Sequence, residues 1–318
     1  MSAAIQSVLT VLGVLVGLLA LAAGLTFIER RLLGLFQERC GPNRAGPFGL
    51  LQVVADAVKI LTKEDWIAPF SDRVVFFLAP AIMVFATVMP FSVVVFSPAV
   101  TVADLNIGLL FFLAMSSLAV YGVALGGWAS NSKYSLLGSL RAVGQMVSYE
   151  VFMGLSVMGV VVLAGSFSLG EIVRAQSRMW FCIPQLPGLV IFLIAGSAES
   201  RRIPFDLPEA EAELVAGFHT EYSGFKFAFF YIGEYVGITL LSTFVVVLFF
   251  GGWLGPWLPP ILWFFIKLAI VIAFLILVRA ALPRLRYDQL MRFGWMVMLP
   301  LALLNLLVTG ALVLAAGG

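Results

Sequence analysis

Eight long apolar stretches, separated by more polar segments, constrain the fold of this 318-residue chain. A helix needs roughly 20 mostly apolar residues to cross the ~30 Å hydrocarbon layer of a bilayer. Because backbone groups in lipid must form their hydrogen bonds within the segment, we interpret the stretches as helices and not strands. The expected spans cover approximately residues 5–28, 74–97, 105–128, 143–165, 185–199, 227–250, 260–282 and 294–314. The fifth is the shortest.

The composition agrees with an all-α, polytopic membrane protein built as a single integral membrane domain, residues 1–318. Hydrophobic residues make up 62% of the chain and charged residues only 11%, whereas soluble domains are about half apolar and a quarter charged. The net charge of +2 gives no reason to expect a nucleic-acid partner. One histidine and two distant cysteines predict no metal site. No basic segment precedes the first apolar run, so we expect a retained span rather than a cleaved signal peptide.

The distribution of basic residues predicts the orientation. If the eight stretches span the membrane, the loops at 29–73, 129–142, 200–226 and 283–293, with the adjoining span ends, hold sixteen of the nineteen Lys and Arg residues. The positive-inside rule therefore places these loops in the cytoplasm and both termini on the outer, periplasmic side. The long first inner loop also contains a helical pattern, with apolar Leu50, Leu51, Val54, Val58 and Leu61. This pattern predicts an amphipathic helix at the membrane surface.

Three charged residues, Glu150, Glu234 and Lys267, fall well inside predicted spans, away from the span ends. Glu150 lies in the fourth span and Glu234 in the sixth, each at an expected depth of roughly 10 Å or more. Intramembrane carboxylates usually face a protein interior and mark proton or ion paths. The alternative is a structural hydrogen bond between helices. Lys267, in the seventh span, is either a third buried group or a side chain that extends to the outer surface.

The segment SAESRRIPFDLPEAEAEL, residues 197–214, is unusually rich in charge for this chain. Glu209, Glu211 and Glu213 alternate with other residues, so they are either on an extended segment or distributed around a short helix after Pro208. Neighbouring carboxylates raise one another's pKa, which favours proton exchange near neutral pH. A solvated acidic loop is the alternative. Arg202 is expected to pair with Asp206.

Several segments together resemble one known family. They are ERRLLGLFQERCGPNRAGPFGLLQVVADAVKILTKED, SYEVF, ESRRIPFDLPEAEAELVAGFHTEYSG, GEY and PRLRYDQLM, in this order along nearly the whole chain. This set is similar to the family of H subunits of NADH–quinone oxidoreductase, respiratory complex I, in its proteobacterial form. The resemblance implies eight core spans at the heel of the membrane arm, where the hydrophilic arm docks.

The resemblance also implies roles for individual residues. Residues implied to line or support the quinone chamber are Glu29, Arg30, Arg39, Asp56, Arg202, Asp206 and Arg279. Residues implied to form a proton path are Glu150, Glu209, Glu211, Glu213, Glu221 and Glu234. Arg284 and Arg286 match a basic loop before the last span. Many relatives carry Asn at position 201, so the resemblance assigns no role to Arg201; Glu199, Lys267, Cys40 and Cys182 also stay without one.

The implied activity is proton-translocating quinone reduction by a multisubunit enzyme of the bacterial inner membrane. Quinone is the implied substrate, and FMN and iron–sulfur clusters are implied in partner subunits, with no redox centre in this chain. Implied partners are the iron–sulfur and quinone-site hydrophilic subunits, small membrane subunits, antiporter-like subunits and lipid. Two alternatives stay open: a homologous component of a membrane-bound hydrogenase-type complex, and a stand-alone cation transporter.

Overall fold

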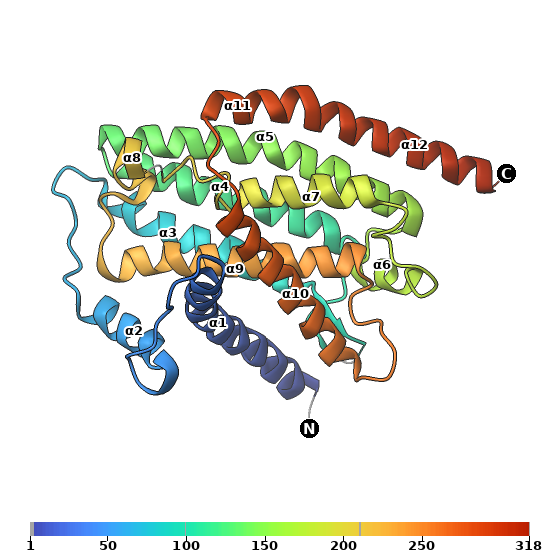
Figure 1. Ribbon diagram of the computed structural model, residues 1–318, viewed down its shortest axis with the longest axis horizontal. Helices are drawn as coiled ribbons and strands as arrows, with labels where there is room; N and C mark the ends of the chain where they lie inside the picture. The colour runs from blue at the N-terminus through green and yellow to red at the C-terminus, as the bar shows by residue number, and fades with distance from the viewer. Residues whose placement is uncertain (1–2, 99, 210, 318) are drawn as a thin grey trace.

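The computed structural model describes residues 3–98, 100–209 and 211–317, without the side chains at 3, 4, 6, 7, 211, 212 and 317. This part of the chain is a bundle of helices (Figure 1), which confirms the all-α polytopic prediction. It contains seven helices long and apolar enough to cross a membrane and one shorter apolar helix. The long helices are α1 (Ala3–Phe36), α3 (Arg73–Val88), α4 (Gly108–Ala129), α5 (Lys133–Ala164), α9 (Gly224–Phe249), α10 (Pro260–Ala281), and α11 (Tyr287–Phe293) continued through a π-helical turn (Gly294–Met298) into α12 (Leu299–Gly317).

The shorter elements lie mainly in the connections between these helices. They are α2 (Gln52–Thr62), α6 (Leu169–Ala175), α7 (Leu186–Glu199), α8 (Glu211–Leu214), strands β1 (Val95–Ser97) and β2 (Val100–Thr101), and 3-10 turns at Pro47–Gly49, Met89–Ser92 and Gly217–His219. β1 and β2 form an antiparallel hairpin in which Val95 lies opposite Thr101 and Ser97 opposite Val100. The prediction of helix over the last part of 74–97 is therefore wrong. Pro90 cannot donate a helical hydrogen bond, and the β-branched run at 93–95 favours an extended backbone.

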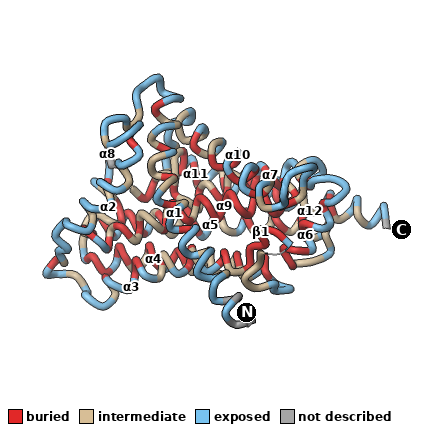
Figure 2. The backbone as a smooth tube through the Cα atoms, turned by 90° about the horizontal axis from the view of Figure 1, so that it is seen from below, coloured by how far each residue is buried: buried red, intermediate tan, exposed pale blue. Residues whose placement is uncertain are grey.

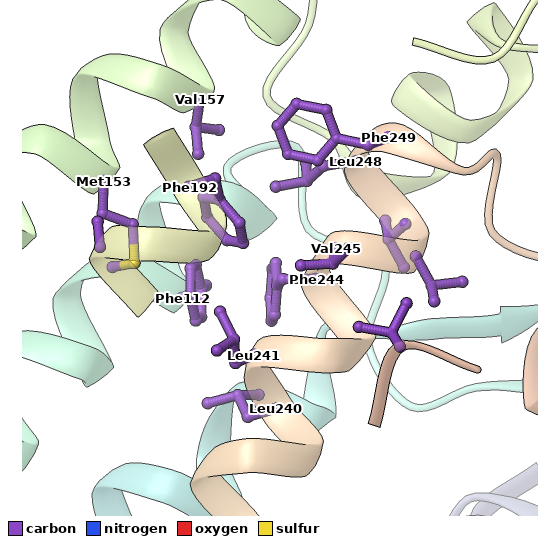
Figure 3. Packing of buried hydrophobic residues seen from close by; sticks show 14 of the residues in the cluster. Phe112, Met153, Val157, Phe192, Leu240, Leu241, Phe244, Val245, Leu248 and Phe249 are labelled. Atoms are coloured by element: carbon purple, nitrogen blue, oxygen red, sulfur yellow. The ribbon is translucent and has the colours of Figure 1, made fainter. Parts of the chain in front are cut away.

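Helix α9 is the central element of the bundle. It is apolar on all sides and packs against α1, α3, α7 and α10, so most of its residues are buried, as expected for a helix without a polar face. Figure 3 shows the core that results, to which α4 contributes Phe112, α7 contributes Phe192 and α9 contributes Phe244. The rings of Phe112 and Phe244 stack with their centroids 3.6 Å apart. This packing holds α9 in place and therefore also sets the positions of its charged residues.

The two ends of the bundle differ. In Figure 1, α2 and α8 lie towards one end of the long axis, and α6 and the C-terminus lie towards the other. Figure 2 shows that the buried residues gather in the middle of the molecule, whereas the N- and C-terminal arms are largely exposed. α2 forms where a surface helix was predicted and buries none of its residues; its apolar Val54 and Val58 are exposed. Its position at a membrane surface stays a prediction.

Helix α7 alone is shorter than the hydrocarbon layer of a bilayer is thick. Its 14 residues reach about 21 Å at 1.5 Å per residue, compared with a hydrocarbon thickness of about 30 Å. The chain that follows therefore continues inside the protein, where Arg201, Phe205 and Leu207 are buried. Irregular backbone at such a depth is tolerated when protein surrounds it. The short helix thus brings the charged segment after residue 199 into the bundle.

Candidate functional site

Two contacts hold the segment after α7 in place. Gln145, buried on α5, donates from Nε2 to the carbonyl oxygens of Ala198 at 2.6 Å and Phe205 at 2.8 Å. Further along, Gly217 has a φ of +59°, and a Cβ there would lie 1.8 Å from the carbonyl oxygen of Pro208. Glycine is required at this close approach because a side chain would collide with the backbone. The described residues at 200–209 and 213–217 therefore pack against the bundle and do not form a freely solvated acidic loop.

Arg202 joins three separate parts of the fold. Its Nη1 lies 2.5 Å from a carboxylate oxygen of Glu29 on α1, and its Nε lies 2.7 Å from one of Glu234 on α9. Its guanidinium carbon also lies 4.6 Å from the ring centroid of Tyr235. The Arg202 and Glu29 side chains are only 10% and 4% exposed. Sequence reasoning expected Asp206 as a partner of Arg202; Glu29 and Glu234 are carboxylates that Arg202 contacts in the structure, and both lie far from it in the sequence.

Helix α10 and the loop after it complete this cluster. Arg279, near the end of α10, forms a second ion pair with Glu29. Arg284 donates to the backbone carbonyl of Asp206, which ties the loop before α11 to the segment after α7. The structure thus brings together Glu29, Arg202, Glu234 and Arg279, four residues from distant parts of the sequence.

A polar cavity of about 210 Å³, which we call the loop cavity, opens beside these ion pairs. Its polar lining residues are Arg201, Glu209, His219, Tyr231, Glu234, Tyr235 and Arg279, and its aromatic ones are Phe218, Phe227 and Phe230. Burial, repulsion by Glu234 and repulsion by Asp206 raise the pKa of Glu209 to about 8, against the attraction of Arg201 and Arg202. Burial and the charge of Arg201 lower the pKa of His219 to about 4, so His219 is neutral near pH 7.

The raised pKa of Glu209 predicts a pH-dependent stability. An unfolded glutamate loses its proton near the ordinary value of 4.5, whereas Glu209 in the fold keeps it up to about 8. Between these values the native state binds more protons, so the free energy of unfolding falls as pH rises. Glu209→Gln removes this decrease in the free energy of unfolding, because glutamine does not titrate. Its melting temperature relative to the natural chain is therefore expected to rise between about pH 5 and pH 8 and then to stay constant.

The measurement is thermal denaturation of the purified protein over that pH range. Glu38→Gln, which removes an exposed carboxylate of the first inner loop, is the matched control. A melting temperature of Glu209→Gln that stays constant or falls relative to that of the natural chain as pH rises contradicts the assignment.

A second and smaller cavity, which we call the helix cavity, lies deeper between α3, α4, α5, α7 and α9. Its volume is about 50 Å³, and its polar lining is Thr87, Ser116, Glu199, Ser200, Arg201 and Glu234. Arg201 and Glu234 therefore line both cavities. Sequence reasoning gave Glu199 no role, although its position at the end of an unusually short apolar stretch was a usable signal. Glu199 also interacts electrostatically with Glu150.

Glu150 lies in the middle of α5 (Lys133–Ala164), deeper along its helix than the predicted span start at 143 indicated. Ser117 of α4 donates its hydroxyl hydrogen to the Glu150 carboxylate. Hydroxyl donation stabilises a carboxylate away from water and leaves its second oxygen available to exchange a proton. The half-buried acids Glu234, Glu199 and Glu150 thus form a series that runs from the ion-pair cluster into the helical core.

The remaining acids of the third inner loop have different surroundings. Glu213, on α8, is exposed and lies 2.6 Å from Arg141; hydrogen bonding and attraction by Arg141 lower its pKa. Glu209 faces the loop cavity instead, so these two acids have different surroundings. The side chain of Glu211 lies outside the described residues. Glu221 is half-buried between the 3-10 turn and α9.

The residues predicted from the first inner loop are only partly in the cluster. Arg30 pairs with Asp56 of α2 at 2.6 Å, so these two tie α2 to the end of α1. Arg39 is exposed and donates to Gln37 at 2.9 Å. Glu29 is the one residue of this predicted group that enters the buried ion-pair network among the described side chains.

Lys267 lies near the opposite end of the bundle and has a structural role. Its Nζ donates to the carbonyl oxygens of Phe250, Gly252 and Leu254 at 2.7, 3.0 and 2.6 Å. The ammonium group also lies 4.4 Å from the ring centroid of Trp180. Carbonyls that follow the end of a helix favour a nearby cation. Lys267 therefore caps the turn after α9 and contributes to no acid series.

The fold and the site together define a class: a multi-pass helical membrane protein with a network of buried acids and arginines beneath one end of its bundle. A family model described as NADH dehydrogenase matches residues 9–310. The H subunit of the NADH-quinone oxidoreductase of Methylococcus capsulatus is 61% identical over 302 residues, which cover 95% of this chain and 96% of that relative. The chain therefore belongs to the family of H subunits of NADH–quinone oxidoreductase, and the resemblance drawn from its motifs is confirmed.

Proposed function

We propose that this chain is the membrane subunit of a proton-pumping NADH–quinone oxidoreductase that helps to form the quinone chamber and couples quinone reduction to proton translocation. The observation that carries the proposal is the position of Arg201 and Glu234 between two cavities. One cavity is polar and aromatic, as expected for a site near a quinone headgroup, and the other leads to buried carboxylates. A change of charge in the loop cavity can therefore act, through Arg201 and Glu234, on the carboxylates of the helix cavity.

The chemistry in the chamber is a two-electron reduction. Quinone gains two electrons and two protons and becomes quinol. The electrons originate from NADH and reach the quinone through flavin and iron–sulfur clusters of partner subunits. In this chain, the loop cavity supplies ionisable side chains to the reaction: Glu209 carries an exchangeable proton near neutral pH, whereas His219 is neutral. Arg279 and Tyr235 contribute hydrogen-bond donors to the same lining.

Coupling follows from charge. Two unit charges 4 Å apart interact by about 4 kcal/mol at an effective dielectric constant of 20, which corresponds to nearly three pKa units. A change of charge in the chamber is expected to alter the proton affinity of Glu209 and Glu234, which line the loop cavity. Glu199 and Glu150 then provide the next positions for a proton towards the interior of the membrane arm.

The topology and partners follow from the same proposal. The inner loops, with most of the Lys and Arg residues, face the cytoplasm of a bacterial cell, and both termini are periplasmic. The hydrophilic iron–sulfur and quinone-site subunits dock on the end of the bundle that carries α2 and α8 (Figure 1). Small membrane subunits and antiporter-like subunits lie beside it in the lipid.

A photoreactive short-chain quinone tests the chamber assignment in isolated membranes that contain the assembled enzyme. We expect crosslinks to peptides between residues 201 and 235 or around Arg279, because these carry the lining of the loop cavity. Excess unreactive quinone is expected to suppress them. Crosslinks confined to the lipid-facing α12, or crosslinks that excess quinone does not suppress, contradict the assignment. If the chain instead co-purifies with a nickel–iron protein, it belongs to a hydrogenase-type complex. If it purifies alone, it is a stand-alone transporter.

A further inference from the structure

Arg201 differs from its neighbour Arg202 in its contacts. Arg201 is only 5% exposed, and its backbone is left-handed with a φ of 56°. Its Nε and Nη1 are buried and have no hydrogen-bond partner among the described residues. Arg202, in contrast, forms ion pairs with two carboxylates. The Nε and Nη1 atoms of Arg201 therefore lack the partners that the same two atoms of Arg202 have, and of the Arg202 nitrogen atoms only Nη2 is without one among the described residues.

The surroundings of Arg201 are acidic and aromatic. Glu209, Glu234, Asp206 and Glu199 all act electrostatically on its guanidinium, although burial outweighs them and lowers its pKa. Among the ion pairs formed by described residues, none includes Arg201. One face of the guanidinium is covered by the ring of Phe218, whose centroid lies 5.0 Å from the guanidinium carbon. The in-plane N–H groups are therefore the part of Arg201 that can bind something else.

Both cavities offer space for that contact. Arg201 lines the loop cavity of about 210 Å³ and the helix cavity of about 50 Å³. A water molecule needs a probe volume of only about 10–15 Å³ and two to four polar partners. Buried polar groups are almost always hydrogen-bonded, to protein or to ordered water. Glu209 and His219 on one side, and Glu199 and Ser116 on the other, can serve as further partners.

We propose that Arg201 is a positioning residue that holds ordered water between the two cavities and thereby joins Glu209 to Glu199 in one hydrogen-bonded path. The guanidinium donates from Nε and Nη1 to water oxygens, and the carboxylates on either side accept from the same waters. A proton that leaves Glu209 can then reach Glu199 by transfer along the water chain, with no net change at Arg201. This inference rests on the proposed function, since it assigns a step within that proton path.

Three substitutions at this position separate water binding from charge and from shape. Arg201→Leu and Arg201→Asn introduce side chains of similar size, of which only asparagine can hydrogen-bond to water. In the assembled enzyme, proton pumping of Arg201→Leu is expected to fall about tenfold or more, since positioned proton transfer contributes 10²–10⁴-fold in typical sites. Arg201→Asn and Arg201→Lys are expected to stay within about threefold of the natural enzyme. The solvent deuterium isotope effect is expected to rise only in Arg201→Leu.

Equal losses in Arg201→Leu and Arg201→Asn overturn the inference, as does normal pumping in Arg201→Leu. If Arg201→Leu fails to assemble, a high-resolution cryo-electron-microscopy map of the natural enzyme decides instead. Ordered water within hydrogen-bond distance of both Nε and Nη1 supports the inference, and a protein side chain in those positions overturns it. Loss of pumping in Glu150→Gln together with normal pumping in Arg201→Leu leaves the proposed function intact and removes only the role of Arg201.

Discussion

Arg202→Met is expected to destabilise the protein by about 3–5 kcal/mol, because removal of one partner from a buried ion pair leaves an uncompensated charge. Here the substitution leaves two carboxylates behind. Arg202 contacts Glu29 at 2.5 Å and Glu234 at 2.7 Å, and these carboxylates come from α1 and α9. Arg279 can compensate only Glu29. We therefore expect little assembled enzyme in membranes and a strongly lowered melting temperature of what remains.

The exposed pair of Arg286 with Asp288 supplies the control. These side chains are 79% and 67% exposed, so Arg286→Met is expected to change the free energy of unfolding by at most about 1 kcal/mol. Arg202→Lys keeps the positive charge but lacks the forked guanidinium group that reaches two carboxylates. Its loss of stability is therefore expected to lie between those of Arg286→Met and Arg202→Met. Arg202→Met combined with Glu29→Gln and Glu234→Gln removes the buried charges together and is expected to restore part of the stability. Equal melting temperatures for Arg202→Met and Arg286→Met contradict this account.

The second large effect is expected at Glu150. Glutamine has nearly the same shape as glutamate but holds no exchangeable carboxyl proton. Ser117 donates to Glu150 in the natural chain, and the side-chain amide of glutamine offers the same hydroxyl an acceptor oxygen. Packing is thus preserved while proton transfer is lost. Because a positioned proton-transfer group contributes typically 10²–10⁴-fold, Glu150→Gln is expected to lower pumping by about tenfold or more.

The long spans could be predicted from the sequence because the bilayer sets their length and composition. The predicted span at 260–282 and helix α10 (Pro260–Ala281), for example, nearly coincide. The last part of 74–97 could not be assigned in this way, since a run of valines is as apolar in a buried hairpin as in a helix. The start of α5 at Lys133 was also missed, because polar residues at the head of a helix lower the apolar signal without ending the helix.

The charged cluster was predictable in its residues but not in its pairings. The partners of Arg202 lie 173 and 32 positions away, so no local spacing indicates them. Sequence reasoning chose Asp206, four residues away, because nearby charges are the only ones that a pattern can pair. Glu199 and Arg201 were left without a role for a related reason. Their surroundings, and the burial of Arg201 above all, depend on the short α7, which turns the loop after it into part of the core.

The most direct test of the coupling proposal is proton pumping per NADH oxidised in proteoliposomes that contain the purified assembled enzyme. The variants are Glu150→Gln and Glu213→Gln, one half-buried in α5 and one exposed beside Arg141. Glu171→Gln, in α6 and outside the acid series, is the matched control. The account predicts that quinone reduction or pumping is impaired in Glu150→Gln and Glu213→Gln and is natural in the control. Natural quinone reduction and natural pumping in both variants would contradict it.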